Sequence, residues 1–254
     1  MTLSFLGSLP AIPLLLIGQR KRARELTHYN GGVIARTLQR ICFYPSVITG
    51  MENLPPPETA CVYVANHQST VDIAVFFAIR RNYAWVSKAS VFLVPGVGLL
   101  MRLAGYVSLQ RGSKESGKKM MEDCRKDCLE KGWSVVIFPQ GTRRRHKILD
   151  FKMGAFKLAQ EARVPIVPVT IELPEKMYGI GCKDRPRLII HKPIAPDDPL
   201  FQDRDALLAH TFGTIVGALS YGPAMLQRQR ADAAAAARLT AAAAEVAPDA
   251  KKEA

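Results

Sequence analysis

Cysteine is scarce and irregularly placed in this chain. Of 254 residues only five are cysteines, an odd number, and no two of them form a C-x-x-C pair. This usage argues against a disulfide-rich secreted scaffold and against a zinc site built on cysteine pairs. Cys124 and Cys128 lie one helical turn apart, a spacing typical of two buried thiols on a core face. We therefore expect a reducing compartment and no bound metal.

The chain also lacks an uninterrupted apolar run of the roughly 20 residues that a membrane-spanning helix needs. The strongest candidate, residues 3–17, contains Pro10 and Pro13, and no basic residue precedes it as in a signal peptide. A basic cluster follows this run, formed by Arg20, Lys21, Arg22 and Arg24. This order predicts a membrane-associated anchor, with the rest of the chain facing the cytoplasm. The alternative is a hydrophobic N-terminal helix packed on the domain.

Acidic residues are outnumbered, 22 against 35 Lys and Arg, which gives a formal net charge of +13. Such a balance predicts anionic partners: nucleic acid, anionic lipid headgroups or phosphorylated substrates. Aromatic residues make up only 7% of the chain, and the basic residues do not alternate with them. Single-stranded nucleic acid binding usually depends on that alternation. The composition therefore favours a lipid surface or a phosphorylated small molecule over nucleic acid.

Strand-like and helix-like segments alternate along most of the chain, which predicts an α/β fold with a largely parallel, mixed sheet flanked by helices. The expected strands cover residues 60–65, 83–88, 106–109, 134–139, 164–173 and 187–194. The expected helices cover residues 28–45, 73–79, 113–131, 153–162 and 207–219. We divide the chain into an N-terminal anchoring segment (1–48), one α/β domain (49–222) and an alanine-rich tail (223–254). The tail is expected to be disordered or marginally helical.

The most informative stretch is Asn66-His67-Gln68-Ser69-Thr70-Val71-Asp72, at a predicted strand-to-helix junction. On an ideal helix, His67 and Asp72 would diverge by about 140°. They can meet only if His67 lies in the loop and Asp72 reaches back from the first helical turn. The carboxylate could then hold one ring nitrogen and leave the other free as a base. The alternative is a helix cap beside a histidine with no chemical role.

A second stretch, Phe138-Pro139-Gln140-Gly141-Thr142-Arg143, follows the buried strand expected at 134–139. Gly141 would let backbone N–H groups approach an oxyanion closely. Thr142 adds a hydroxyl donor, and Arg143 offers a planar fork suited to phosphate. The alternative is a basic, solvated turn.

The two stretches together, in this order and separation, resemble the glycerolipid acyltransferase family, and most closely its lysophosphatidate acyltransferases. The resemblance covers roughly residues 50–195. It implies transfer of a fatty acyl group from acyl-CoA or acyl carrier protein to the free hydroxyl of lysophosphatidate, at a membrane and without a cofactor. His67 would be the general base and Asp72 would orient it. Residues implied for substrate binding are Lys88, Arg111, Gln140, Gly141, Thr142 and Arg143.

Gln140 departs from the family pattern, which usually has glutamate at this place. Glutamine keeps hydrogen-bonding capacity but loses the charge, which puts binding or activity in doubt. A catalytically weakened, basic membrane-surface protein therefore remains an alternative, as does an enzyme acting on glycerol-3-phosphate or another lysophospholipid. A serine hydrolase using Ser69 is disfavoured, because the G-x-S-x-G elbow is missing. The apolar stretch 89–105 would line an acyl-chain site, enter the bilayer, or form a buried core helix.

Overall fold

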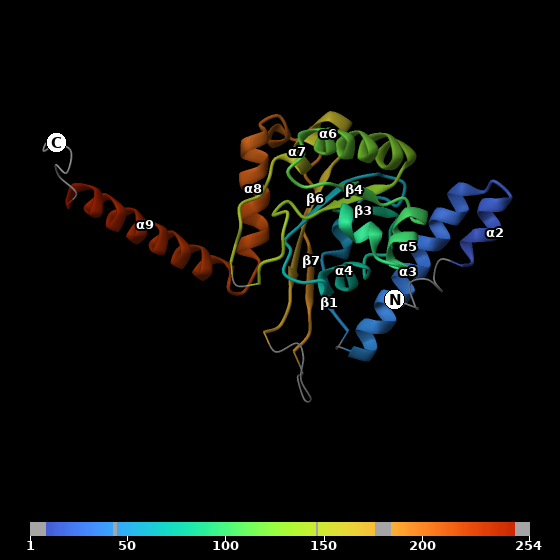
Figure 1. Ribbon diagram of the computed structural model, residues 1–254, viewed down its shortest axis with the longest axis horizontal. Coiled ribbons are helices and arrows are strands. Elements are labelled where there is room, and N and C mark those ends of the chain that lie inside the picture. The colour runs from blue at the N-terminus through green and yellow to red at the C-terminus, as the bar shows by residue number, and fades with distance from the viewer. Residues whose placement is uncertain (1–8, 43–44, 146, 176–183, 247–254) are drawn as a thin grey trace, which may run out of the picture.

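The computed structural model describes residues 9–42, 45–145, 147–175 and 184–246 (Figure 1). Seven strands form one sheet in the order β1-β7-β6-β2-β5-β3-β4. Their bounds are β1 Val47–Thr49, β2 Val62–Ala65, β3 Tyr83–Lys88, β4 Val107–Leu109, β5 Ser134–Ile137, β6 Ile166–Glu172 and β7 Arg187–Ile190. The only antiparallel pair among these strands is β6–β7. The expected largely parallel, mixed α/β sheet is confirmed.

The centre of the sheet is a fully buried, apolar strand. β2 pairs in parallel with β5 through Val62 and Val135, and with β6 through Val62 and Ile166. All four residues of β2 and all four of β5 are buried. Strands that are buried along their whole length in this way are typical of parallel sheets that are covered on both faces. The carboxyl ends of β2 and β5 therefore lie side by side on a rigid support.

The helices are α2 Ala11–Leu16, α3 Arg20–Cys42, α4 Val71–Phe76, α5 Val97–Leu103, α6 Lys114–Asp123, α7 Gly154–Ala162, α8 Arg204–Gly217 and α9 Gly222–Val246. α3 packs against α2, α4 and α5, while α7 and α8 contact β2 and β6, respectively. In Figure 1, α2 and α3 lie on the side of the body opposite α9. Within the described parts of the chain, no helix combines the length and apolar character needed to cross a membrane.

Two expectations about helices need correction. α3 begins at Arg20, not near residue 28, so the whole basic cluster belongs to this helix. The single helix expected over 113–131 ends at Asp123; a π-helical turn, Cys124–Cys128, and a 3-10 turn, Leu129–Lys131, continue it. The wider turn allows both cysteines and Leu129 to be buried. The described part of the alanine-rich tail is helical, one of the two states expected for it, and belongs to α9, which extends away from the body (Figure 1).

The apolar stretch 89–105 forms a 3-10 turn, Ala89–Leu93, followed by α5. Phe92, Leu100 and Met101 are buried in the core, whereas Leu93 is 76% exposed. The stretch is therefore partly core and partly surface. Only the described part of the 3–17 segment, from residue 9 onward, can be placed, and its Ala11–Leu16 portion is α2.

Candidate active site

His67 and Asp72 meet at the carboxyl end of β2. His67 lies in the loop after the strand, and Asp72 is in the first turn of α4. Nδ1 of His67 is 2.7 Å from Oδ2 of Asp72, as the five-residue spacing required. Because the carboxylate can only accept a hydrogen bond, Nδ1 carries the proton and Nε2 presents its lone pair.

Asp72 is held by more than the histidine. The same oxygen, Oδ2, also accepts hydrogen bonds from the backbone N–H groups of Gln68 (2.6 Å) and Ser69 (2.8 Å). The side chain is fully buried, and its other oxygen, Oδ1, has no hydrogen-bond partner among the described residues. The loop therefore wraps its backbone donors around one carboxylate oxygen, which fixes the direction in which Asp72 faces the imidazole.

The imidazole ring of His67 stacks on the aromatic core with one face and meets a cation at its edge. The ring lies parallel to Phe138, with centroids 3.9 Å apart and an interplanar angle of 8°. Phe138 in turn stacks on Trp85 at the end of the aromatic core. Nε2 of His67 accepts a hydrogen bond from Nε of Arg143 at 3.2 Å, and the side chain of His67 is only 9% exposed. Arg143 therefore covers the nitrogen that would act as a base.

Gln140 joins the two motifs through its amide oxygen. Oε1 accepts a hydrogen bond from the backbone N–H of His67 at 2.6 Å, and the side chain is buried. A second contact between the motifs runs from the backbone N–H of Arg144 to the carbonyl oxygen of His67 (3.1 Å). A neutral amide oxygen suffices to position this backbone, so this contact does not need the charge of a glutamate.

The loop after β5 also carries Lys152, a cation that the sequence did not single out. Gly141 has a φ of +70°, and a Cβ on it would lie 3.2 Å from Nζ of Lys152. Glycine therefore supplies the left-handed backbone and leaves room for the lysine. Lys152 belongs to no motif, and it reaches the loop because its backbone N–H bonds the carbonyl oxygen of Pro139. Thr142 is half-buried between Gly141 and Arg143.

Lys88 and Arg111 also lie at the carboxyl ends of strands, but farther from His67. Lys88 ends β3, and Arg111 follows β4; both are exposed. β3 and β4 are two and three positions from β2 in the sheet, or about 10 and 14 Å at the usual strand spacing. The structure therefore brings His67, Asp72, Gln140, Gly141 and Arg143 together and leaves these two cations at the periphery.

Two further polar side chains support the first motif, and neither was predicted. Asn66 exchanges hydrogen bonds of 2.8 Å with the backbone N–H and carbonyl of Ile171, which fastens the end of β2 to β6. Nε2 of Gln68 donates to the same carbonyl and to the hydroxyl of Tyr221 (2.6 Å). Burial, with the charges of Glu172 and Asp72, raises the pKa of Tyr221 to about 12, so this hydroxyl stays protonated.

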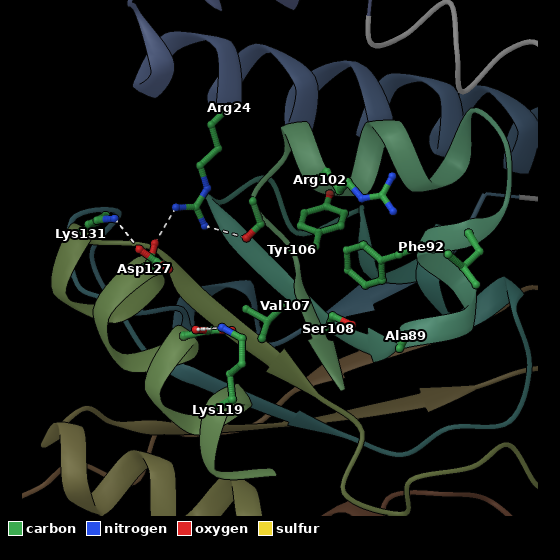
Figure 2. Close-up of a pocket in the computed structure, with 13 residues that line it drawn as sticks. Arg24, Ala89, Phe92, Arg102, Tyr106, Val107, Ser108, Lys119, Asp127 and Lys131 are labelled. Carbon is green, nitrogen blue, oxygen red and sulfur yellow. Dashed lines mark hydrogen bonds and ion pairs between the residues drawn. The ribbon is translucent and has the colours of Figure 1, made fainter. Parts of the chain in front are cut away.

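A cavity of about 600 Å³ lies at the β4 edge of the sheet (Figure 2). Its apolar wall includes Phe92, Leu93 and Val107, and α6 with the turns after it provides the charged wall. In that wall, Lys119 pairs with Asp123 and Lys131 pairs with Asp127. None of the predicted site residues lines this cavity.

Comparison with known proteins gives a consistent result. A family model described as "Acyltransferase" matches residues 46–172. A chloroplastic 1-acyl-sn-glycerol-3-phosphate acyltransferase of Brassica napus is 39% identical over 194 residues, covering 72% of this chain and 54% of that protein. A 1-acyl-sn-glycerol-3-phosphate acyltransferase of Chlamydomonas reinhardtii is 37% identical over 216 residues, covering 80% and 64%. The chain thus spans somewhat more than half the length of these relatives.

A solved structure is also similar. The 1-acyl-sn-glycerophosphate acyltransferase from Thermotoga maritima superposes with a TM-score of 0.62 at 23% identity. The match covers 84% of this chain and 92% of the other. The similarity in fold therefore extends over most of both chains.

Proposed function

The chain belongs to the acyltransferase family, and we propose that it transfers a fatty acyl group to the free hydroxyl of lysophosphatidate, giving phosphatidate. The acyl donor would be acyl-CoA or acylated acyl carrier protein. The names of the relatives support the acceptor. The observation that carries the proposal is the His67–Asp72 pair, whose remaining nitrogen, Nε2, faces a cationic loop.

In the proposed reaction, Nε2 of His67 removes the proton from the acceptor hydroxyl as its oxygen attacks the thioester carbonyl carbon. The tetrahedral intermediate then collapses, the carbon–sulfur bond breaks, and the leaving thiolate takes the proton from the imidazolium. Asp72 stabilises the imidazolium and keeps the proton of the resting enzyme on Nδ1. No protein nucleophile is needed, because the acceptor itself supplies the attacking oxygen.

Arg143 would have two roles in this scheme. In the free protein its guanidinium covers Nε2 of His67. A phosphate on the acceptor is a stronger partner for a guanidinium than a neutral imidazole nitrogen. Binding of the acceptor would therefore draw Arg143 away and free the base. Lys152 and Thr142 would complete the phosphate site, and Arg111 and Lys88 would attract the acceptor from the edge of the sheet.

We also propose association with a bilayer through α2 and α3, with the α/β domain facing the cytoplasm. Large apolar side chains are exposed there, including Leu16 (83%), Ile17 (66%) and Ile41 (75%). Basic residues of α3 lie beside them, as expected for a helix held at an anionic interface. Exposed Leu93 and the apolar wall of the Figure 2 cavity support a place for the acyl chain near residues 89–105.

The competing function with a specific observation behind it is a weakened, membrane-binding relative, because Gln140 replaces the usual glutamate. The bond from the backbone of His67 to Oε1 of Gln140 disfavours this alternative, since it needs an acceptor and not a charge. Glycerol-3-phosphate and other lysophospholipids stay open as acceptors, because the motifs are shared.

A transfer assay decides among these possibilities. The protein would be incubated with labelled acyl-CoA, or with labelled acyl carrier protein, and lysophosphatidate, glycerol-3-phosphate or lysophosphatidylcholine. We expect preferred transfer to lysophosphatidate, and loss of transfer in His67→Ala with an unchanged thermal unfolding midpoint. Near wild-type turnover in His67→Ala would refute the base assignment. Failure of the wild type with every acceptor would favour the binding protein.

A further inference from the structure

A second cavity, of about 460 Å³, lies between α3 and the segment that connects α4 to β3. Four arginines line it, and no aspartate or glutamate does. Arg36 and Arg40 come from successive turns of α3, and Arg80 and Arg81 come from the connecting segment. None of the four forms an ion pair within the described parts of the chain. An arrangement of like charges without a counter-charge is costly unless an anion completes it.

The cavity is built into the fold and is not a chance grouping of surface side chains. Nη1 of Arg36 donates to the carbonyl oxygen of Phe77 at 3.0 Å. Gly32 makes room for this contact: a Cβ there would lie 2.8 Å from Nη1 of Arg36 and 3.1 Å from Cδ1 of Phe77. Burial lowers the pKa of Arg36, as do the neighbouring charges of Arg80 and Arg40. Packing therefore holds this guanidinium beside other cations.

Arg81 provides the observation that points to a ligand. Its carbonyl oxygen accepts a hydrogen bond from Nε2 of His28 at 3.0 Å, which fixes the connecting segment to α3. Its side-chain Nε is buried and has no hydrogen-bond partner among the described residues. Unpaired buried donors are rare in folded proteins because they lose hydrogen bonds to water without replacement. Nη1 of Arg81 donates to the carbonyl oxygen of Arg80 at 3.2 Å, which holds the guanidinium at the cavity, where an anion would be its charged partner.

The cavity in Figure 2 serves as an internal comparison. It has a similar number of cations, but Lys119 and Lys131 are neutralised there by Asp123 and Asp127. Arg24 lines the same cavity, and its guanidinium donates hydrogen bonds to the backbone carbonyls of Ala104, Gly105 and Asp127. Of these two cavities, the one beside α3 is lined by several arginines and by no acidic residue.

We propose that the cavity lined by Arg36, Arg40, Arg80 and Arg81 is a second phosphate site, which binds the headgroup phosphate of an anionic phospholipid. It lies at the amino end of β3, whereas His67 and Arg143 lie at the carboxyl ends of β2 and β5. The six residues of β3 separate the two ends of the sheet by about 20 Å. One phosphate cannot occupy both places.

A lipid is favoured over a free phosphate because apolar side chains surround the rim. Val33 and Tyr29 of α3 line the cavity and are 38% and 64% exposed. Ile41, the residue after Arg40, is 75% exposed. The headgroup would enter between the arginines while the glycerol backbone and chains lie along this exposed face of α3. This assignment does not depend on the transfer reaction, since it concerns binding alone.

The test is calorimetric titration of the full chain with dihexanoylphosphatidylglycerol below its micelle concentration, beside inorganic phosphate. Arg40→Gln/Arg80→Gln removes two exposed cations of the cavity without removing a hydrogen bond that holds the fold. Arg102→Gln/Lys119→Gln removes the same charge from the cavity of Figure 2 and is the matched control. Arg81→Lys keeps the charge but lacks the Nε–H. His67→Ala reports on the active site.

We expect saturable binding of one lipid, weakened at least 10-fold by Arg40→Gln/Arg80→Gln and about 5-fold by Arg81→Lys. The control double variant should stay within 2-fold of the wild type, and His67→Ala should bind normally. Equal weakening by both double variants would reduce the effect to net charge and overturn the proposal. Inorganic phosphate binding as tightly as the lipid would overturn the headgroup assignment. Loss of lipid binding in His67→Ala would place the lipid in the active site instead.

Discussion

The substitution Asp72→Asn separates two roles of the carboxylate that most histidine–aspartate pairs combine. In this protein, Oδ2 of Asp72 accepts three hydrogen bonds, from Nδ1 of His67 and from the backbone N–H groups of Gln68 and Ser69. An asparagine has one acceptor and one donor end. If its NH2 group took the place of Oδ2, it would face three donors. The amide must therefore present its oxygen there, and NH2 must take the place of Oδ1, which lacks a partner now.

The backbone donors therefore keep His67 in its productive tautomer after the charge is gone. The loss is then only the difference between a charge-assisted and a neutral hydrogen bond to the imidazolium, about 1 to 2 kcal/mol. This corresponds to roughly a 5- to 30-fold lower kcat. Asp72→Ala, in contrast, leaves the ring free to turn and two N–H groups unpaired. It should lose most of the contribution of general-base catalysis, about 10²- to 10⁴-fold.

The assay is the steady-state rate of acyl transfer to lysophosphatidate for the wild type and both variants. Thermal unfolding serves as the control, and Asp72→Ala should be the less stable variant, by at least about 2 kcal/mol for two unpaired backbone donors. An Asp72→Asn protein as inactive as Asp72→Ala would mean that Gln68 and Ser69 do not set the orientation of the amide. An Asp72→Asn protein as fast as the wild type would remove the charge from the mechanism.

Three further perturbations follow from the same geometry. Arg143→Ala should raise KM for lysophosphatidate about 10- to 100-fold, because a charge-assisted bond to phosphate is lost; a fall in kcat alone would remove Arg143 from that role. Gln140→Glu should keep activity within about 3-fold and Gln140→Ala should not, since the backbone of His67 needs an acceptor; equal activity of both variants would contradict this. His28 is buried, and its burial lowers its pKa from 6.5 to about 4, so between these values only the unfolded chain takes up the proton. Stability should therefore fall by about 2 kcal/mol between pH 6.5 and pH 5, and urea unfolding of His28→Gln should lack that part of the loss.

The sequence could predict the elements and the pair of motifs because these depend on local patterns. The apolar runs of β2 and β5 indicate buried parallel strands, and the five-residue spacing of His67 and Asp72 requires a loop-to-helix junction. Both features depend on residues that are close together in the sequence, so they can be recognised without a structure. About two extra turns at the start of α3 were missed because the first residues of this helix are basic and carry no apolar periodicity.

The contacts that complete the site could not be predicted, because they join distant segments. Gln68 bonds Tyr221, which is 153 residues away. Arg143 contacts Nε2 of His67, which is 76 residues away. In the sequence, nothing distinguishes this arginine from one that is only solvated. Lys152 lies beside Gly141 only because the loop folds back onto Pro139. No local signal specifies any of these three placements.

The order of the strands also shows which of the candidate phosphate-binding cations lie nearest to His67, which the sequence could not show. In a lysophosphatidate acceptor, the free hydroxyl and the phosphate ester occupy adjacent carbons. A hydroxyl at Nε2 of His67 therefore leaves the phosphate within about one strand spacing, ~5 Å. β5 is the neighbour of β2, whereas β3 and β4 follow outward. In the proposed reaction the phosphate would therefore be held from the loop after β5, where Arg143 contacts His67 and Lys152 lies beside Gly141. Arg111, three strands away, would reach the same phosphate only with an extended side chain, so its removal should affect capture of the acceptor more than its position.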